Sequence, residues 1–264
     1  YPSFTSADFD WTGIGAQATL AEVAVDTLTG SEDRARCWGL WPSENPRNDV
    51  MQQVLESIGA DIVSGTDDKI LIRLIDDAPT AEIAFTAKHI INIDRRYGPE
   101  SVERPNLCVV KYYSPERNYD MGEIDMTGIA WARIEDEIDR YGEKTFVVEL
   151  PFCPSASQAQ RIARRLFRMA RADAGVATLN LAGLAAWGLR YVSLYFPDID
   201  VTELCAIGTP RVNDDEGTVE IPFVVWPDLP TWDEDVDEAP APPDIPELEY
   251  AGDLTKPSTP SAAT

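Results

Sequence analysis

The chain has 264 residues, 44% of them hydrophobic, so it is long enough to bury a core in one large domain or two smaller ones. Its 46 acidic residues outnumber the 22 Lys and Arg residues, which leaves a net charge of −24. This charge argues against a protein that grips nucleic acid or docks on an anionic membrane surface. No run of about 18 apolar residues is present, so no membrane-spanning segment is expected.

Four cysteines lie far apart in the sequence and form no Cys-x-x-Cys pair, which argues against zinc ribbons and dithiol redox sites. We expect Cys37, Cys108, Cys153 and Cys205 to be half-buried free thiols. His89 is the only histidine, so a Ser-His-Asp or Cys-His catalytic group would have to use it. No nucleophile motif lies near it, and we expect an ordinary hydrogen-bonded or surface histidine.

Residues 45–75 predict a helix followed by a hairpin. Apolar residues recur at helical spacing after Pro46, which suits the first position of a helix capped by Asn45. Gly59 can end this helix in the left-handed conformation. Two short strands would follow, joined by a tight turn at 65–68 and spanning 61–64 and 69–75.

The next predicted strands lie at 107–114 and 145–150. In the second, alternation places Phe146, Val148 and Leu150 on one face. The sequence between the two strands is polar and poorly periodic. We therefore expect a long excursion there, with one short helix at 134–141.

The most regular helix, predicted over 155–173, opens with a possible capping box of Ser155 and Gln158. One stripe of it is apolar, and the other side carries five arginines: Arg161, Arg164, Arg165, Arg168 and Arg171. This basic face is a local exception in an acidic chain. It is either a solvated face that pairs with nearby acids or a partner interface whose Arg forks bind carboxylates of a neighbouring subunit.

Further strands are predicted at 177–181, 190–196, 203–212 and 218–226, with a turn at 213–217. A packed helix followed by antiparallel strands predicts an α+β fold: a barrel-like antiparallel sheet with a flanking amphipathic helix, plus a smaller helix–hairpin subdomain. The remaining residues, 228–264, are rich in proline and hold ten of the 46 acids and one of the 22 bases. They predict an extended linker or arm, and residues 1–227 still carry 36 acids against 21 bases.

Carboxylates are the main candidates for chemistry. A glycosidase-type pair could come from Glu135, Asp136 and Glu137 or from Asp198, Asp200 and Glu203. Adjacent acids are expected by chance among 46, however, and no aromatic groove flanks them. The acidic turn at 213–217 lacks the ligand spacing of a calcium loop, and no nucleotide-binding glycine pattern is present. The residues therefore predict no catalytic group, no metal site and no cofactor.

Several segments resemble those of phage tail hub and tail tip proteins, the families of the lambdoid tip attachment protein and the gene transfer agent hub protein. The run Val-Glu-Leu-Pro-Phe-Cys-Pro-Ser-Ala-Ser-Gln-Ala-Gln-Arg-Ile-Ala-Arg at 148–164 is similar to a signature that opens a helix there. Segments 49–60, 68–72 and 105–115, which precede this run, also resemble segments of the family and occur in the same order as they do there. In one departure, Ala-Trp-Gly-Leu-Arg-Tyr at 186–191 stands where members often carry a Pro-Gly-Asp turn.

The resemblance spans about residues 37–232, so we divide the chain into four parts: an unmatched segment of unknown role (1–36), the helix–hairpin subdomain (37–84), a tube-like β-barrel hub domain (85–232) and the acidic linker or arm (233–264). It further implies a virion structural protein, generally a homotrimer, which closes or extends the distal end of the tail tube and guides DNA exit. Its expected partners are tail tube proteins, other tail tip or fibre proteins, and transiting DNA without specific binding. We expect assembly in the host cytoplasm into the tail tip of the virion. No catalytic residue transfers from the resemblance.

Two other functions stay open at this point. The chain could be a virion-associated, carboxylate-dependent polysaccharide or cell-wall hydrolase. It could also be a receptor-binding module, although the trailing linker suggests that a binding domain would lie further downstream.

Overall fold

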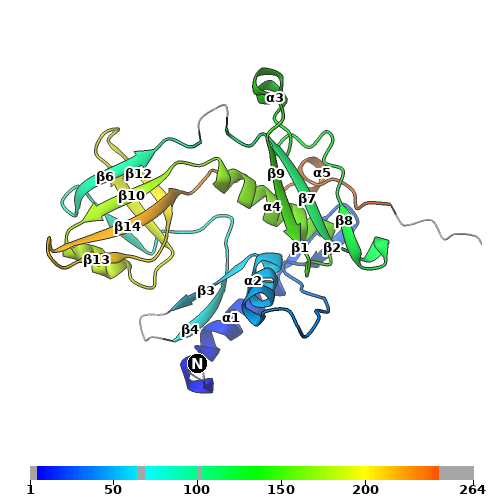
Figure 1. The fold of residues 1–264 in the computed structure, drawn as a ribbon, viewed down its shortest axis with the longest axis horizontal. Coiled ribbons are helices and arrows are strands. Elements are labelled where there is room, and N and C mark those ends of the chain that lie inside the picture. Colours follow the sequence, from blue (N-terminus) through cyan, green and yellow to red (C-terminus); the bar gives the residue numbers. More distant parts are fainter. Residues whose placement is uncertain (1–4, 65–68, 100–102, 244–264) are drawn as a thin grey trace, which may run out of the picture.

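Residues 5–64, 69–99 and 103–243 are described by a computed structural model, in which they form an α+β fold with four sheets (Figure 1). This confirms the predicted mixture of helix and sheet. The α-helices are α1 (Trp11–Ala21), α2 (Arg47–Ile58), α3 (Glu135–Tyr141), α4 (Ala156–Ala170) and α5 (Glu234–Asp237). Three 3-10 turns accompany them: η1 (Ser6–Asp8), η2 (Pro115–Arg117) and η3 (Leu181–Ala186).

The largest sheet has seven strands in the order β5-β11-β12-β14-β10-β6, with β13 paired to β14. They are β5 (Ile83–Phe85), β6 (Ile90–Arg96), β10 (Ala174–Leu179), β11 (Tyr191–Phe196), β12 (Val201–Ile207), β13 (Arg211–Asn213) and β14 (Thr218–Val225). Apart from the parallel pair β5–β11, the pairing is antiparallel. Among the described residues no ladder joins β5 to β6, so the sheet is not a closed barrel.

The strand predicted at 203–212 is two strands. β12 ends at Ile207, and the chain passes through Gly208 and Pro210 before β13 begins. Pro210 has no N–H to donate to a ladder, and this interruption explains the division.

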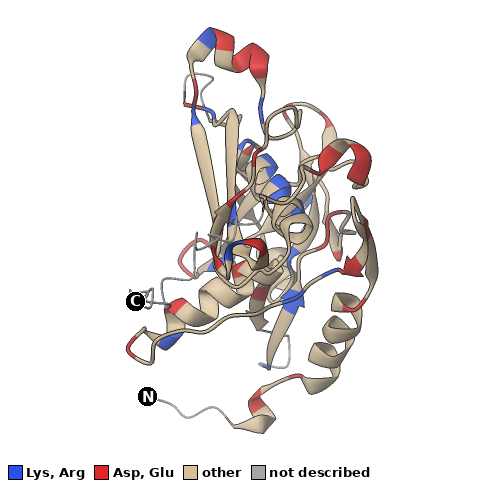
Figure 2. Cartoon of the chain, turned by 90° about the vertical axis from the view of Figure 1, so that its right-hand side faces the viewer, with Lys and Arg blue, Asp and Glu red and all other residues tan. Residues whose placement is uncertain are grey.

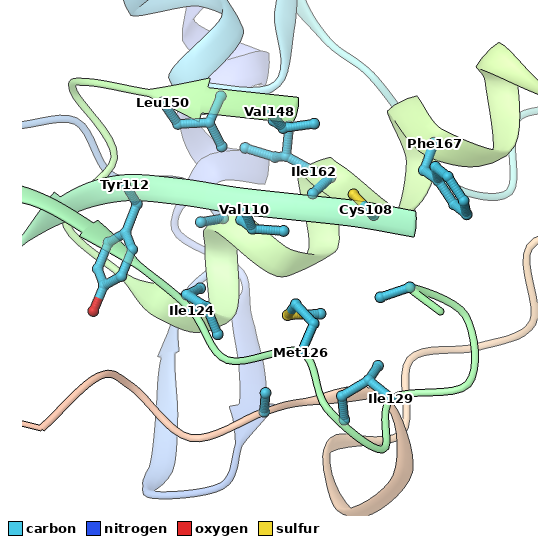
Figure 3. Close-up of a cluster of buried hydrophobic side chains, with 14 of the residues drawn as sticks. Cys108, Val110, Tyr112, Ile124, Met126, Ile129, Val148, Leu150, Ile162 and Phe167 are labelled. Atoms are coloured by element: carbon cyan, nitrogen blue, oxygen red, sulfur yellow. The ribbon is translucent and has the colours of Figure 1, made fainter. Parts of the chain in front are cut away.

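A second, three-stranded sheet has the order β8-β7-β9, formed by β7 (Leu107–Ser114), β8 (Asp120–Glu123) and β9 (Thr145–Leu150). β7 and β9 are parallel, with Leu107 opposite Thr145 and Tyr112 opposite Leu150. Helix α4 covers one face of this sheet (Figure 3). The prediction that this amphipathic helix flanks the antiparallel sheet is therefore wrong.

The core between α4 and this sheet draws on the segment expected to be a polar excursion. Side chains from both β7 and β9 meet Ile162 and Phe167 of α4, and the far side is closed by residues that follow β8 (Figure 3). The closing residues are Ile124, Met126, Ile129, Trp131 and Ala132, all at most 9% exposed. The short helix predicted near 134–141 is confirmed as α3.

The helix–hairpin unit consists of α2, β3 (Ala60–Ser64) and β4 (Ile70–Leu74). Gly59 ends α2 at φ 65°, the left-handed conformation that the sequence predicted. The cap position falls on Pro46 and not on Asn45, and no side chain caps this helix. The predicted turn at 65–68 lies outside the described residues.

Residues 5–36, to which the sequence analysis assigned no element, form η1, α1 and a hairpin of β1 (Ala24–Thr27) and β2 (Gly30–Asp33). Asp10 caps α1 by accepting the N–H of Gly13 at 3.0 Å. The N–H of Asp10 in turn donates to the carbonyl of Ile70, so this segment lies along the edge of β4.

All four cysteines are free, as expected, but their burial differs from the prediction. Cys37 is exposed, whereas Cys108, Cys153 and Cys205 are at most 1% exposed. Burial raises the pKa of each of these three thiols to about 12, so they remain protonated and act as core side chains.

Candidate functional site

Helix α4 is the centre of the molecule's polar contacts, and its first turn fixes two distant segments. The Oγ of Ser155 caps the helix by accepting the N–H of Gln158 at 3.1 Å. The Gln158 side chain does not return to Ser155, so only half of the predicted capping box forms. Its amide instead accepts the N–H of Arg36 at 2.7 Å and donates to the carbonyls of Arg36 and Ser57 at 2.9 and 2.7 Å.

Gln160 makes the corresponding contact with the C-terminal segment. Its Oε1 accepts the N–H of Ala239 at 2.7 Å, and its Nε2 donates to the carbonyl of the same residue at 2.8 Å. Both residues are at most 2% exposed. A buried backbone unit must find partners for its N–H and its C=O, and this one amide side chain satisfies both groups.

Arg161 holds the N-terminal hairpin. Its Nη2 lies 2.8 Å from a carboxylate oxygen of Glu32 in β2, and its Nη1 donates to the carbonyl of Arg34 at 3.1 Å. The Oγ of Ser155 donates to the same Glu32 carboxylate at 2.8 Å. Burial lowers the pKa of Arg161, and the negative charge of Glu32 opposes that shift.

Arg165 holds the segment that follows the hairpin of β3 and β4. Its Nη1 donates to the Asp77 carboxylate at 2.9 Å and to the carbonyl of Ile75 at 3.3 Å. The guanidinium packs directly over Gly59, where a Cβ atom would clash with it. Gly59 therefore serves two purposes, since it ends α2 with a positive φ and leaves room for Arg165.

Arg164 holds the chain that leaves the seven-stranded sheet. It donates to the Asp237 carboxylate at 2.9 Å and to the carbonyl of Pro230 at 2.7 Å, and it lies 5.5 Å from the centre of the Trp232 ring. The indole N–H of Trp131 donates to the carbonyl of Asp237 at 2.8 Å. The first part of the predicted linker is thus bound to α4, while residues 244–264 lie outside the described part of the chain.

At the C-terminal end of α4, Arg171 forms a two-pronged ion pair with Glu137 of α3, at 2.7 and 3.0 Å. It also donates to the carbonyl of Pro105. This arginine is the main reason that the pKa of Glu137 lies below its ordinary value. Arg168 makes no ion pair within the described ranges, and burial, helped by neighbouring Arg164 and Arg171, lowers its pKa.

The sequence left two interpretations of the arginine face, a solvated face that pairs with nearby acids and an interface with a neighbouring subunit. These contacts test the first of them. A solvated face is wrong for Arg164 and Arg165, which are 6% and 5% exposed. Pairing with acids of the same chain is found for four of the five arginines, and Figure 2 shows basic residues gathered on the central helix. A contact with a neighbouring subunit stays a prediction, for which Arg168 is the available side chain.

Four of the six acids considered for hydrolysis, Glu137 among them, are bound by other side chains. Glu135 pairs with Arg133, Glu203 pairs with Arg95, and Asp200 accepts the hydroxyl of Tyr195 at 2.8 Å. Within the described part of the chain, no group of three or more His, Cys, Asp or Glu side chains could hold a metal ion. None of its helices is long and apolar enough to cross a bilayer.

The sequence interpretation missed the residues that make α4 a junction: Gln158, Gln160, Glu32 and Asp237. The signal for the glutamines was present, because two amides at the start of a strongly amphipathic helix need buried partners. The acids gave no such signal, since Asp237 lies in an acidic, proline-rich run and Glu32 lies in a segment without a recognised pattern.

Comparison with known proteins fits this architecture. The family described as "Putative phage tail protein" matches residues 47–187, which include α2, the three-stranded sheet and all of α4. The chain belongs to this family of phage tail proteins. Membership of this family indicates a structural role in a phage tail. No curated protein matches the chain.

Three solved structures are similar in fold. A chain of the native gene transfer agent virion is 16% identical with a TM-score of 0.51, and the match covers 88% of this chain and 48% of that one. The 43 kDa tail protein of prophage MuSo2 from Shewanella oneidensis is 11% identical with a TM-score of 0.43, covering 76% and 57%. A tail protein from Neisseria meningitidis MC58 is 13% identical with a TM-score of 0.44, covering 85% and 70%. The chain thus spans about half the length of the first two.

Proposed function

We propose that this chain is a hub module at the tail tip, where copies of it, three in the simplest case, extend or close the distal end of the tail tube and guide DNA out. The observation that carries this proposal is the junction at α4. One helix binds the N-terminal hairpin, the segments at both ends of the helix–hairpin unit, α3 and the C-terminal segment through ion pairs and side-chain amides. Such contacts between distant segments suit a structural subunit that must keep its shape when force acts on the tail.

The seven-stranded sheet would supply the barrel-like element of the hub. Its path is open between β5 and β6, and neighbouring copies or other tail proteins would continue the wall. Fold similarity to a chain of the gene transfer agent virion supports this arrangement.

The charge distribution supports DNA passage without binding. Four of the five arginines of α4 pair with acids of the same chain, so little of their positive charge is left to offset the excess of acids. A ring of three copies would triple the net charge of −24. A strongly negative wall repels phosphates and disfavours adhesion of the passing DNA.

We further propose that the chain performs no catalytic step and that its shape and surface charge are the working parts. Native mass spectrometry of purified tail tips is expected to show three copies per particle, and zymography on cell-wall and polysaccharide substrates is expected to show no clearing. A single copy per particle would contradict the ring. Clearing that is lost on changing one acid would contradict the absence of catalysis.

A further inference from the structure

The three-stranded sheet has one face that no element of the described chain covers. Side chains of β7 alternate, and Cys108, Val110 and Tyr112 lie under α4 while their neighbours point the other way. Parallel strands such as β7 and β9 are usually buried on both faces, because the crossover segments cover them. Here α4 covers one face only (Figure 1).

The uncovered face carries exposed apolar residues on both sides of a charged row, in which Lys111 of β7 lies between Glu123 of β8 and Glu149 of β9. On one side Val147 of β9, 49% exposed, lies opposite Val109, with Leu107 two residues away; on the other Met121 of β8, 42% exposed, lies opposite Tyr113. Leu107, Val109 and Tyr113 are partly exposed. We call these five apolar residues the outer sheet face. Leu107, Val109 and Val147 adjoin one another, and adjoining exposed apolar residues on a folded protein mark interaction sites more often than scattered ones do.

A hollow opens at one end of the outer sheet face. After Glu123 the chain stops pairing as β8 and continues through Ile124, whose N–H donates to the carbonyl of Val110 at 3.0 Å. The divergence leaves a cavity of about 320 Å³ whose walls include Leu107, Val109, Glu123, Asp125 and Arg133. Its size suits one long side chain.

The charges around this hollow favour a basic occupant. Arg133 is engaged, because it binds Glu135 at 2.7 Å and Glu143 at 3.2 Å. Lys111, on the same face, is bound to Glu149 at 3.3 Å. Glu123 and Asp125 are exposed and form no ion pair with a described residue. A side chain that enters the hollow would therefore contact these two carboxylates as well as the aliphatic side chains of its wall.

We propose that the outer sheet face and its hollow form the docking site for a different tail protein, one that presents an aliphatic segment with a lysine or arginine. The aliphatic stem of that side chain packs on Leu107 and Val109, and its charged head meets Glu123 and Asp125. A second copy of this chain fits less well, since its net charge of −24 would bring acids toward acids. This inference rests on the proposed function as a tail component.

Photo-cross-linking in assembled particles tests the partner. A photoreactive amino acid replaces Val147, and a matched control replaces Val212, which is similarly exposed on β13 of the other sheet. We expect Val147 to cross-link to another tail protein, at an aliphatic peptide that contains Lys or Arg. A cross-link to a second copy, a cross-link to an acidic peptide, or no cross-link would each overturn the proposal.

Charge reversal tests the hollow. The double variant Glu123→Lys/Asp125→Lys should lower the yield of assembled particles about tenfold or more, since truncated or reversed interfacial charge pairs weaken binding strongly. Asp214→Lys/Asp215→Lys, with the same charge change in the exposed turn between β13 and β14, should leave the yield unchanged.

Neither double variant should shift the unfolding midpoint of the isolated chain appreciably, because all four substituted carboxylates are exposed. Wild-type yield from the hollow variant would overturn the proposal. The proposed function fails separately, if mass spectrometry finds that purified wild-type tails lack this chain altogether.

Discussion

At the scale of single residues, Gln160 is the most sensitive point of the C-terminal contact. Replacing it with Ala leaves the buried N–H and C=O of Ala239 without partners. We expect Gln160→Ala to lower the free energy of unfolding by about 2–3 kcal/mol. It should also release residues 227–239 to limited proteolysis, which mass spectrometry of the fragments would detect.

Gln52 provides the control for this prediction. It lies on the exposed side of α2, where its amide donates to Glu56 at 2.8 Å. Gln52→Ala should change stability by less than about 0.5 kcal/mol. Equal stability and equal protease resistance of the two variants would refute the role assigned to Gln160.

The pair of Arg171 and Glu137 predicts a pH dependence. Because Arg171 holds the pKa of Glu137 below its ordinary value of 4.5, the pair stabilises the fold above pH 4.5, and this contribution is lost as the pH falls below that value. Solvent screening limits the contribution to about 1 kcal/mol. Denaturant unfolding should therefore show that Arg171→Met is less stable than the wild type at neutral pH.

At acidic pH this difference should shrink, because the wild type loses the same contribution when Glu137 is protonated. The control is Arg133→Met, since Arg133 binds the well-exposed Glu135 and Glu143. It should change the pH profile little. A gap between Arg171→Met and the wild type that stays constant from neutral pH to about pH 3 would contradict the assignment.

At the scale of elements, α4 should respond differently along its arginine face. Arg164 is bound to Asp237 in a largely buried pair, whereas Arg168 has no ion pair among the described residues. Breaking a buried pair on one side leaves an uncompensated charge, so Arg164→Glu should destabilise the fold by roughly 3–5 kcal/mol. Arg168→Glu should leave the isolated fold intact and reduce assembly.

Chemical denaturation and particle counts for the two variants check this prediction together. Full particle yield from Arg168→Glu would make Arg168 an ordinary surface residue. Wild-type stability of Arg164→Glu would refute the buried contact.

The elements that local patterns specify were predictable. The strands β7 and β9 and the helices α2 and α4 follow directly from alternation, helical spacing and capping. The partners of these elements were not, because pairing depends on contacts between residues far apart in sequence. The parallel pairing of β7 with β9 has no local signal, and neither does the packing of α4 on this pair.

The candidate site was likewise predictable only in part from the sequence. The positions of the five arginines on one helix could be read from the sequence, but their burial could not. Burial depends on Glu32, Asp77, Glu137 and Asp237, which come from four separate segments. Likewise, the core residues 124–132 are irregular in conformation, so their apolar side chains follow neither the helical nor the strand period.

At the scale of the whole molecule, two features occur together: the contacts of α4, which hold the parts of the chain in place, and a large excess of acidic residues. The arginines of α4 cross-link the parts of the chain, and the same pairing removes most of their charge from the surface. In the proposed ring, subunits of this kind would keep their shape and repel DNA phosphates. The central claim is therefore that this chain acts through its shape and its surface charge, as a ring at the distal end of the tail tube.

Cryo-electron microscopy of intact particles tests this claim most directly. The account predicts density for this chain in a ring at the distal end of the tail tube, with acidic side chains facing the channel. Density along the shaft or at the capsid, or a distal ring whose channel is lined by Lys and Arg, would contradict it.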